Sequence, residues 1–71
     1  MKHKQLLHYK NYYGSINLDL EDNLLYGKVE FIRALITYEA RDVQGLIQAF
    51  RDAVDDYDSF TKKSTENNHY I

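Results

Sequence analysis

Apolar residues in the second half of the chain recur at the spacing of a single helical face. They are Val43, Leu46, Ile47, Phe50, Ala53, Val54, Tyr57 and Phe60. Intervals of three and four residues place such positions on one side of an α-helix. Asp42 stands immediately before them and has the side chain of a helix N-cap. The pattern predicts an amphipathic helix from Val43 to about Phe60, whose apolar side needs a surface to cover.

Alternating apolar and polar residues in the first half predict antiparallel strands. Within residues 9–20 one face carries Gly14, Ile16, Leu18 and Leu20, and the other carries Ser15, Asn17 and Asp19. This period of two is typical of a half-buried strand. Residues 21–23 suit a hairpin turn before a second strand at 24–30, where Gly27 indicates a bulge or a close backbone approach. A third strand is predicted at 35–39, after a turn at 31–34.

The order strand, strand, strand, helix predicts the α+β class: a three-stranded antiparallel sheet with the helix packed on one face. We expect a single domain over residues 1–71, with its core at about 9–62 and flexible ends at 1–7 and 63–71. A chain of 71 residues buries only roughly 60% of its unfolded surface. Because it contains no cysteine, disulfides cannot support it, and we expect a homodimer or higher homo-oligomer.

The charge and hydropathy of the chain limit the classes of partner that it can bind. The formal net charge is -2 and the pI is about 5.8, which argues against direct nucleic-acid binding and fits a basic protein partner. No stretch approaches the roughly 18–20 apolar residues of a membrane span. The absence of cysteine is compatible with a reducing compartment, and we expect a cytoplasmic protein without membrane contact.

Few residues suggest catalysis or metal binding. The candidate metal or general-acid cluster comprises Asp52, Asp55, Asp56 and Asp58. Helical spacing brings the first three together. However, no histidine and no second carboxylate-bearing segment would complete the coordination shell of a metal. We therefore favour a solvated acidic face. Asp55 and Asp56 could instead be recognition charges for a cationic partner. The histidines lie near the chain ends without ligand spacing, and no nucleophile–base pair or phosphate-binding glycine loop occurs. We therefore expect no enzymatic activity, metal or cofactor.

Tyrosine is abundant, with seven copies. Tyr12, Tyr13, Tyr26 and Tyr38 fall on predicted strands and could stack bases as the sheet of an RNA-recognition domain does. Few basic residues interleave them, so sheet packing and protein contact are favoured. From its residues alone the chain is a non-enzymatic binding module, with a nucleic-acid-binding transcriptional or RNA regulator as the alternative.

Short motifs between Tyr9 and Phe60 follow one another in a specific order. They are Tyr9-Lys10, Tyr13-Gly14-Ser15-Ile16, Leu25-Tyr26-Gly27-Lys28-Val29, Ile32-Arg33, Ile36-Thr37-Tyr38-Glu39, Ala49-Phe50 and Ala53-Val54-Asp55-Asp56-Tyr57. In order and spacing they resemble the N-terminal domain of HicB-type antitoxins, a partly degraded RNase H-like fold. The chain departs from that family at Ala40, where a glycine is usual, and at Gly45, where a glutamate is usual. The Lys-Pro and Gly-Lys pieces that commonly follow the helix are missing.

The resemblance implies an antitoxin that binds a HicA-like toxin, a small basic ribonuclease that cleaves mRNA with a histidine, and occludes its RNA-binding and catalytic surface. Candidate partner contacts are Tyr26, Glu30, Tyr38 and Glu39 on the sheet, with Asp55 and Asp56 on the helix. Family members usually add a C-terminal DNA-binding domain. None fits between Ser64 and Ile71, so we expect a stand-alone or shortened member that does not bind operator DNA alone. The RNase H-like ancestry implies no activity, since no carboxylates suit a two-metal site.

Overall fold

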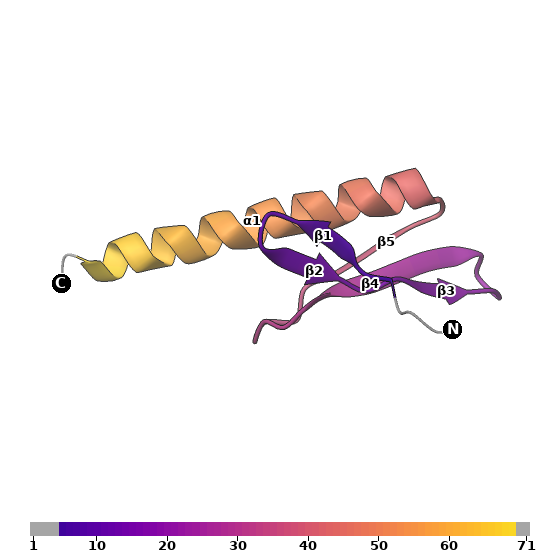
Figure 1. The fold of residues 1–71 in the computed structure, drawn as a ribbon, viewed down its shortest axis with the longest axis horizontal. Helices are drawn as coiled ribbons and strands as arrows, with labels where there is room; N and C mark the ends of the chain where they lie inside the picture. The colour runs from indigo at the N-terminus through magenta and orange to yellow at the C-terminus, as the bar shows by residue number, and fades with distance from the viewer. Residues whose placement is uncertain (1–4, 70–71) are drawn as a thin grey trace.

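An antiparallel sheet with one long helix against one of its faces forms the molecule (Figure 1). The computed structural model describes residues 5–69, and the side chains of residues 5–62. Its elements are β1 (Leu7–Tyr9), β2 (Tyr12–Gly14), β3 (Asn17–Asp19), β4 (Leu24–Glu30), β5 (Thr37–Ala40) and α1 (Val43–His69). The predicted α+β class is confirmed, but the sheet has five strands rather than three. Within the described residues no helix combines the length and apolar character required to cross a bilayer.

Three short strands replace the single strand predicted at residues 9–20. β1 and β2 form a hairpin in which Leu7 lies opposite Gly14 and Tyr9 opposite Tyr12. Its two-residue turn begins at Lys10, which has a φ of 57°, the positive value that tight hairpin turns require. The sequence pattern did not predict this turn, because residues 10 and 11 are lysine and asparagine and neither is glycine.

β2 and β3 then pair with β4 in one common register, with Gly14 opposite Val29 and Asn17 opposite Tyr26. Ser15 interrupts the ladder between them. Its N–H donates to the Lys28 carbonyl at 3.0 Å, but the Lys28 N–H donates to Ser15 Oγ, also at 3.0 Å. The Ser15 carbonyl instead accepts the Tyr38 hydroxyl at 2.9 Å. A side-chain oxygen has therefore replaced a backbone oxygen in the ladder, and this divides the predicted strand.

Two glycines make room for the Tyr38 ring beneath this interruption. A Cβ at Gly27 would overlap the Ser15 carbonyl oxygen, and a Cβ at Gly14 would overlap Tyr38 Oη and lie 2.6 Å from the Phe50 ring. The close backbone approach predicted at Gly27 is thus confirmed. Burial raises the pKa of the enclosed Tyr38 phenol to about 12, so the hydroxyl remains a hydrogen-bond donor at neutral pH.

The core lies between this part of the sheet and α1. Leu46, Phe50 and Val54 are fully buried against Val29 and Tyr38, and the Tyr38 and Phe50 rings meet edge to face with centroids 5.4 Å apart. The predicted helical stripe is confirmed at its centre.

Both ends of the helix add detail to the prediction. Asp42 is the predicted cap, since its Oδ1 accepts the Gly45 N–H at 2.7 Å. Val43 and Phe60 are 62% and 65% exposed, so the stripe is longer than the surface it covers. The helix continues to His69 rather than ending near Phe60. Of the ends predicted to be flexible, 1–7 and 63–71, Leu7 belongs to β1 and residues 63–69 to α1, whereas 1–4 and 70–71 lie outside the described residues.

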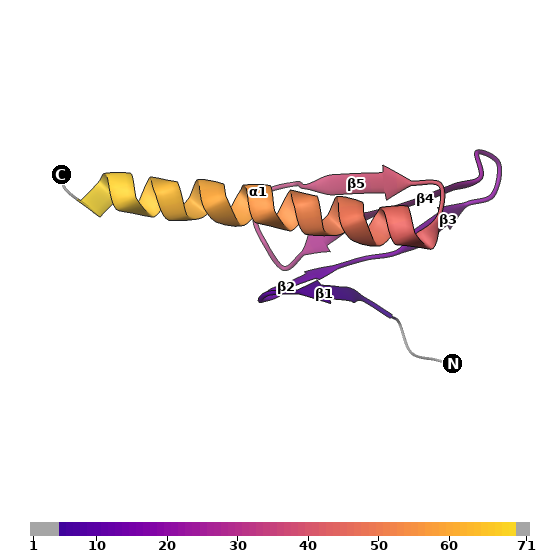
Figure 2. The ribbon, with the colours of Figure 1, turned by 90° about the horizontal axis from the view of Figure 1, so that it is seen from above.

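The apolar face of the predicted first strand is more exposed than a half-buried strand implies. Ile16, Leu18 and Leu20 are 39%, 57% and 82% exposed, whereas Ser15 is buried. The reason is the position of α1, which packs mainly on β5 and β4 (Figure 2). The third strand also begins later than predicted, at Thr37, and Leu35 is exposed.

Both predicted turns are confirmed. Asp19 Oδ1 accepts the N–H groups of Glu21 and Asp22 at the first. Phe31, at a φ of 62°, opens the second.

Replacing Phe50 by alanine should destabilise the fold by about 3–5 kcal/mol, because it empties a fully buried aromatic position. Urea unfolding followed by circular dichroism measures the loss. Phe60→Ala is the matched control on the same helix and should cost about 1 kcal/mol or less, because Phe60 is 65% exposed. Equal losses in the two variants would contradict the observed orientation of the helix.

Gly27→Ala should destabilise the fold by about 3 kcal/mol or more, because the added methyl group meets backbone that is held on both sides. Gly45→Ala is the control. There the added group meets the Asp42 carboxylate and the Ala40 Cβ. A shift of the carboxylate weakens its bond to the Gly45 N–H, but the higher helix propensity of alanine offsets part of this, so the loss should be about 1 kcal/mol and smaller than that of Gly27→Ala. A Gly27→Ala melting curve that coincides with that of the parent would show that Ser15 does not approach β4 as closely as described.

Candidate functional site

The face of the sheet opposite α1 is uncovered, and we call it the open face. It carries the alternate residues of three strands, namely Tyr13, Tyr26, Lys28, Glu30, Thr37 and Glu39. The strand register joins them into one surface, because Glu30 lies opposite Tyr13 and Tyr26 lies opposite Glu39. Directly paired residues of antiparallel strands point to the same face, so β4 supplies the middle row of this surface.

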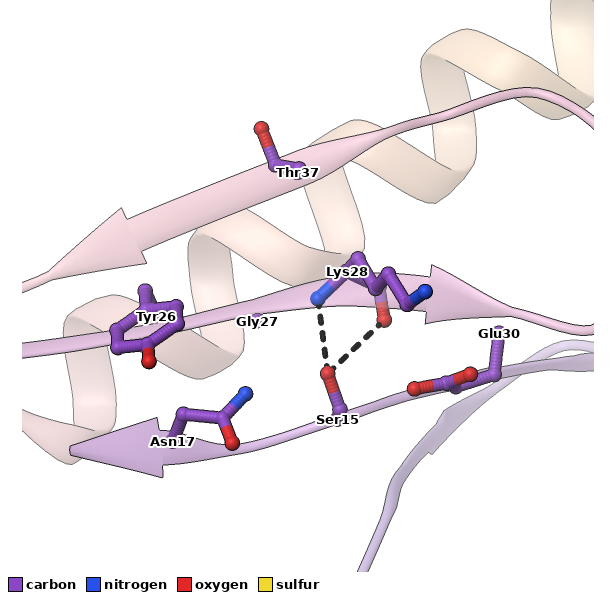
Figure 3. Close-up of a pocket in the computed structure, with 7 residues that line it drawn as sticks. All are labelled: Ser15, Asn17, Tyr26, Gly27, Lys28, Glu30 and Thr37. Atoms are coloured by element: carbon purple, nitrogen blue, oxygen red, sulfur yellow. Dashed lines mark hydrogen bonds between the residues drawn. The ribbon is translucent and has the colours of Figure 1, made fainter.

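A shallow hollow of about 400 Å³ lies at the centre of the open face (Figure 3). It is lined by Ser15, Asn17, Tyr26, Gly27, Lys28, Glu30 and Thr37. The hollow lies between the outward side chains of β4, and it is open above Ser15 because the Ser15 hydroxyl is turned onto the Lys28 backbone. Tyr26 and Asn17 stand at one end and Glu30 at the other (Figure 3). The surface therefore offers a concave polar centre with an aromatic wall and a carboxylate.

Three aromatic side chains cluster beside this hollow. The His8 ring stacks on Tyr13 with centroids 4.5 Å apart and planes 6° apart, and Phe31 meets Tyr13 edge-on at 6.1 Å. Tyr13 is 40% exposed and Phe31 81% exposed. Sequence reasoning missed this cluster because His8 reaches Tyr13 only through the β1–β2 hairpin, which the strand pattern did not reveal.

The structure brings three of the predicted contact residues together. Tyr26 is 43% exposed, Glu39 is exposed and Glu30 is half-buried, and all three lie on the open face. Tyr38 does not belong with them. It points to the helix side of the sheet and is only 7% exposed, so the expectation that its side chain contacts a partner is wrong. Alternation places it opposite Gly27 and therefore under the helix.

Asp55 and Asp58 fasten the β1–β2 hairpin to the helix. Lys10 Nζ lies 2.9 Å from Asp55 Oδ1 and 3.8 Å from Asp58 Oδ2. The Tyr9 hydroxyl donates to Asp55 at 3.4 Å, and the Tyr12 hydroxyl donates to Asp58 at 3.0 Å. The hydrogen bond from Lys10 lowers the pKa of the Asp55 carboxyl, and that from Tyr12 lowers the pKa of Asp58. Asp55 is therefore engaged within the molecule, which leaves it less suited to a partner.

Asp56, although adjacent in sequence, lies on the other flank of α1. It borders a groove of about 540 Å³ between the helix and the start of β5, which is otherwise lined by Ile36, Thr37, Ala53, Tyr57 and Phe60. The two aspartates that the sequence grouped as one recognition patch thus face different surfaces. Among the described side chains of residues 5–62, no group of three or more His, Asp or Glu lies close enough together to hold a metal ion.

Comparison of the chain with protein-family models, curated proteins and solved structures gave no significant match.

We call the contacts of Lys10 with Asp55 and Asp58 the hairpin latch. Acid should weaken it and lower the stability of the fold. Because both carboxyls have a lowered pKa in the folded state, their contribution to stability is complete above the unfolded pKa and is lost as the pH falls through the folded one. The urea midpoint should therefore fall between about pH 5 and about pH 3, and it should fall less in Asp55→Asn. Asp56→Asn, on the opposite flank, is the control and should keep the parent's acid dependence. An Asp55→Asn profile that superimposes on the parent's would exclude the latch.

Proposed function

We propose that this chain is an antitoxin-type inhibitor that uses the open face to cover a small basic HicA-like ribonuclease. The observation that carries the proposal is the composition of that face, where carboxylates and exposed aromatic rings surround a hollow that α1 leaves free. The resemblance of the motif order to HicB-type antitoxins supports it. Aromatic side chains are the usual energetic anchors of protein interfaces, and tyrosine is prominent among them.

Charge favours a contact on the sheet over one on the flank of the helix that carries Asp55 and Asp58. Glu30 and Glu39 have no ion pair within the described residues, whereas Asp55 and Asp58 are already matched by Lys10. Free carboxylates attract a basic partner and speed its approach, an effect that salt screens. We therefore propose Tyr26, Glu30 and Glu39 as contacts, joined by Tyr13 in place of the buried Tyr38.

Inhibition would then proceed by occlusion, without chemistry on the antitoxin. A β-sheet backed by a helix is rigid enough to cover an RNA-binding surface with little loss of conformational entropy on association. RNA and inhibitor would compete for the same basic groups of the toxin. The catalytic histidine beneath the interface would lose its access to substrate.

A nucleic-acid-binding regulator is the second candidate, because the stacked His8–Tyr13 pair and Tyr26 present exposed rings suited to base stacking. Glu30 and Glu39 weigh against it, since carboxylates between the rings repel phosphate. Lys28 is the one basic residue that lines the described hollow.

Titration of a HicA-like toxin with the purified chain should abolish RNA cleavage at about equimolar ratio. Glu39→Lys and Tyr26→Ala should each weaken binding by roughly 10-fold or more, the range of an interface hot spot. Raised salt should slow association of the parent more than its dissociation. Glu21→Lys makes the same charge change in the turn before β4 and should bind like the parent.

Full toxin activity in the presence of excess folded chain would overturn the proposal. Salt-dependent RNA binding by the chain alone, lost in Tyr26→Ala, would instead support the nucleic-acid-binding regulator.

A further inference from the structure

β3 is an edge strand whose outer side no other strand of the described residues covers, and Leu18 in it is exposed. It pairs with β4 on one side, and no strand of the described residues pairs with its other side, because β1 pairs with β2 and stops at Leu7. Leu18 lies opposite Leu25 and therefore on the helix side of the sheet. Ile16 directly precedes β3 and shares this side by alternation, and Leu20 directly follows β3 as the first residue of the turn. With Leu18 at 57% and Leu20 at 82% exposure, the edge is one that soluble monomers normally protect with charge, bulges or covering elements.

Residues 16–20 are complementary to themselves when two copies run antiparallel. In a register centred on Leu18, Ile16 lies opposite Leu20 of the second copy, and Leu18 lies opposite its own equivalent. All the apolar side chains then meet on the helix side. Asn17 lies opposite Asp19 on the other side, so an amide faces a carboxylate and no two like charges are directly opposed.

The geometry of Asp19 leaves it free for this contact. Its Oδ1 accepts the Glu21 and Asp22 N–H groups at 3.1 and 3.3 Å, while its Oδ2 has no hydrogen bond within the described residues. An Asn17 amide of a second copy would supply the missing donor.

We infer that β3 is a homodimer interface, in which two copies join their sheets edge to edge about a two-fold axis through Leu18. In this register each even-numbered residue pairs with another even-numbered residue, so the helix sides of the two sheets coincide. The dimer then has one continuous sheet with both helices on one side. An axis of this kind makes the interface isologous. The open face of each copy remains free, and the inference does not depend on the proposed function.

β5, the other edge, is a weaker candidate for the same role. Its inward residues, Tyr38 and Ala40, are already packed under the chain's own helix. Pairing there would satisfy backbone groups but cover little apolar surface, whereas pairing at β3 covers three apolar side chains from each copy.

Cysteine cross-linking tests the register directly, because the chain has no cysteine of its own. Leu18→Cys should form a disulfide-linked dimer on mild oxidation, since residues paired across antiparallel strands have Cα atoms within disulfide range. Leu20→Cys is the matched control. It is more exposed than Leu18, but its equivalent would lie ~14 Å away, so it should not cross-link. Cross-linking of both to the same extent, or of neither, would overturn the inference.

Sedimentation equilibrium of the full chain tests the assembly without modification. The parent should have twice the 8.4 kDa chain mass, and Leu18→Lys should be a monomer with an unchanged circular dichroism spectrum. Leu35→Lys changes a more exposed apolar position in the loop before β5 and should stay dimeric.

A charge exchange gives an independent check of the Asn17–Asp19 pairing. Asn17→Asp places two carboxylates opposite each other and should weaken the dimer at least 10-fold. The double variant Asn17→Asp with Asp19→Asn restores one amide opposite one carboxylate and should recover the parent's affinity. A monomeric parent that becomes dimeric only when residues 1–4 are deleted would show that the edge belongs to the chain's own N-terminal segment, and would reject the dimer.

Discussion

The Tyr38 hydroxyl, held between the Ser15 and Lys28 carbonyls at 2.9 and 3.2 Å, is the contact on which the rest of the structure depends. The Tyr38 ring lies on the helix side of β4, in the space left by two glycines. Its hydroxyl binds the Ser15 carbonyl, which therefore does not join the β-ladder. The Ser15 hydroxyl then takes over the bond to the Lys28 N–H. Every buried polar group in this exchange finds a partner, so the strand is interrupted without the cost of an unsatisfied donor or acceptor.

Two surfaces follow from this arrangement. On the helix side, Tyr38 is fixed against Phe50, and α1 settles over β4 and β5. Because the helix is placed there, the apolar residues of β3 are left uncovered at the edge. On the other side, the Ser15 hydroxyl is turned onto the Lys28 backbone and lines the hollow of the open face. One local exchange of hydrogen bonds thus shapes both the surface proposed to bind a toxin and the edge inferred to bind a second copy.

Some acidic residues of the helix hold the structure together, and others face solvent. Asp55 and Asp58 hold the β1–β2 hairpin through Lys10 and two tyrosine hydroxyls, and Arg51 lies over the Tyr9 ring at 4.9 Å. The abundance of tyrosine suggested interface residues, but the tyrosines of the structure have three different roles. Tyr38 is core, Tyr9 and Tyr12 tie the hairpin to the helix, and Tyr13 and Tyr26 remain on the open face.

The sequence by itself determined the class of the fold, the start and buried stripe of the helix, its Asp42 cap and the special role of Gly27. These features follow from local chemistry and from periodicity, which are written within a few neighbouring residues. It also placed Tyr26 and Glu30 on one face of the second strand, because alternation along a strand is local too.

Only the tertiary structure decided where that periodicity fails. Ser15 interrupts the β-ladder because its carbonyl accepts a hydroxyl that lies 23 residues away in the chain, and Lys10 turns the chain at a positive φ although no glycine marks the turn. Burial of Tyr38, exposure of Leu18 and the separation of Asp55 from Asp56 depend on where the helix lies over the sheet. That position is fixed by packing between segments distant in sequence, which no pattern of neighbouring residues records.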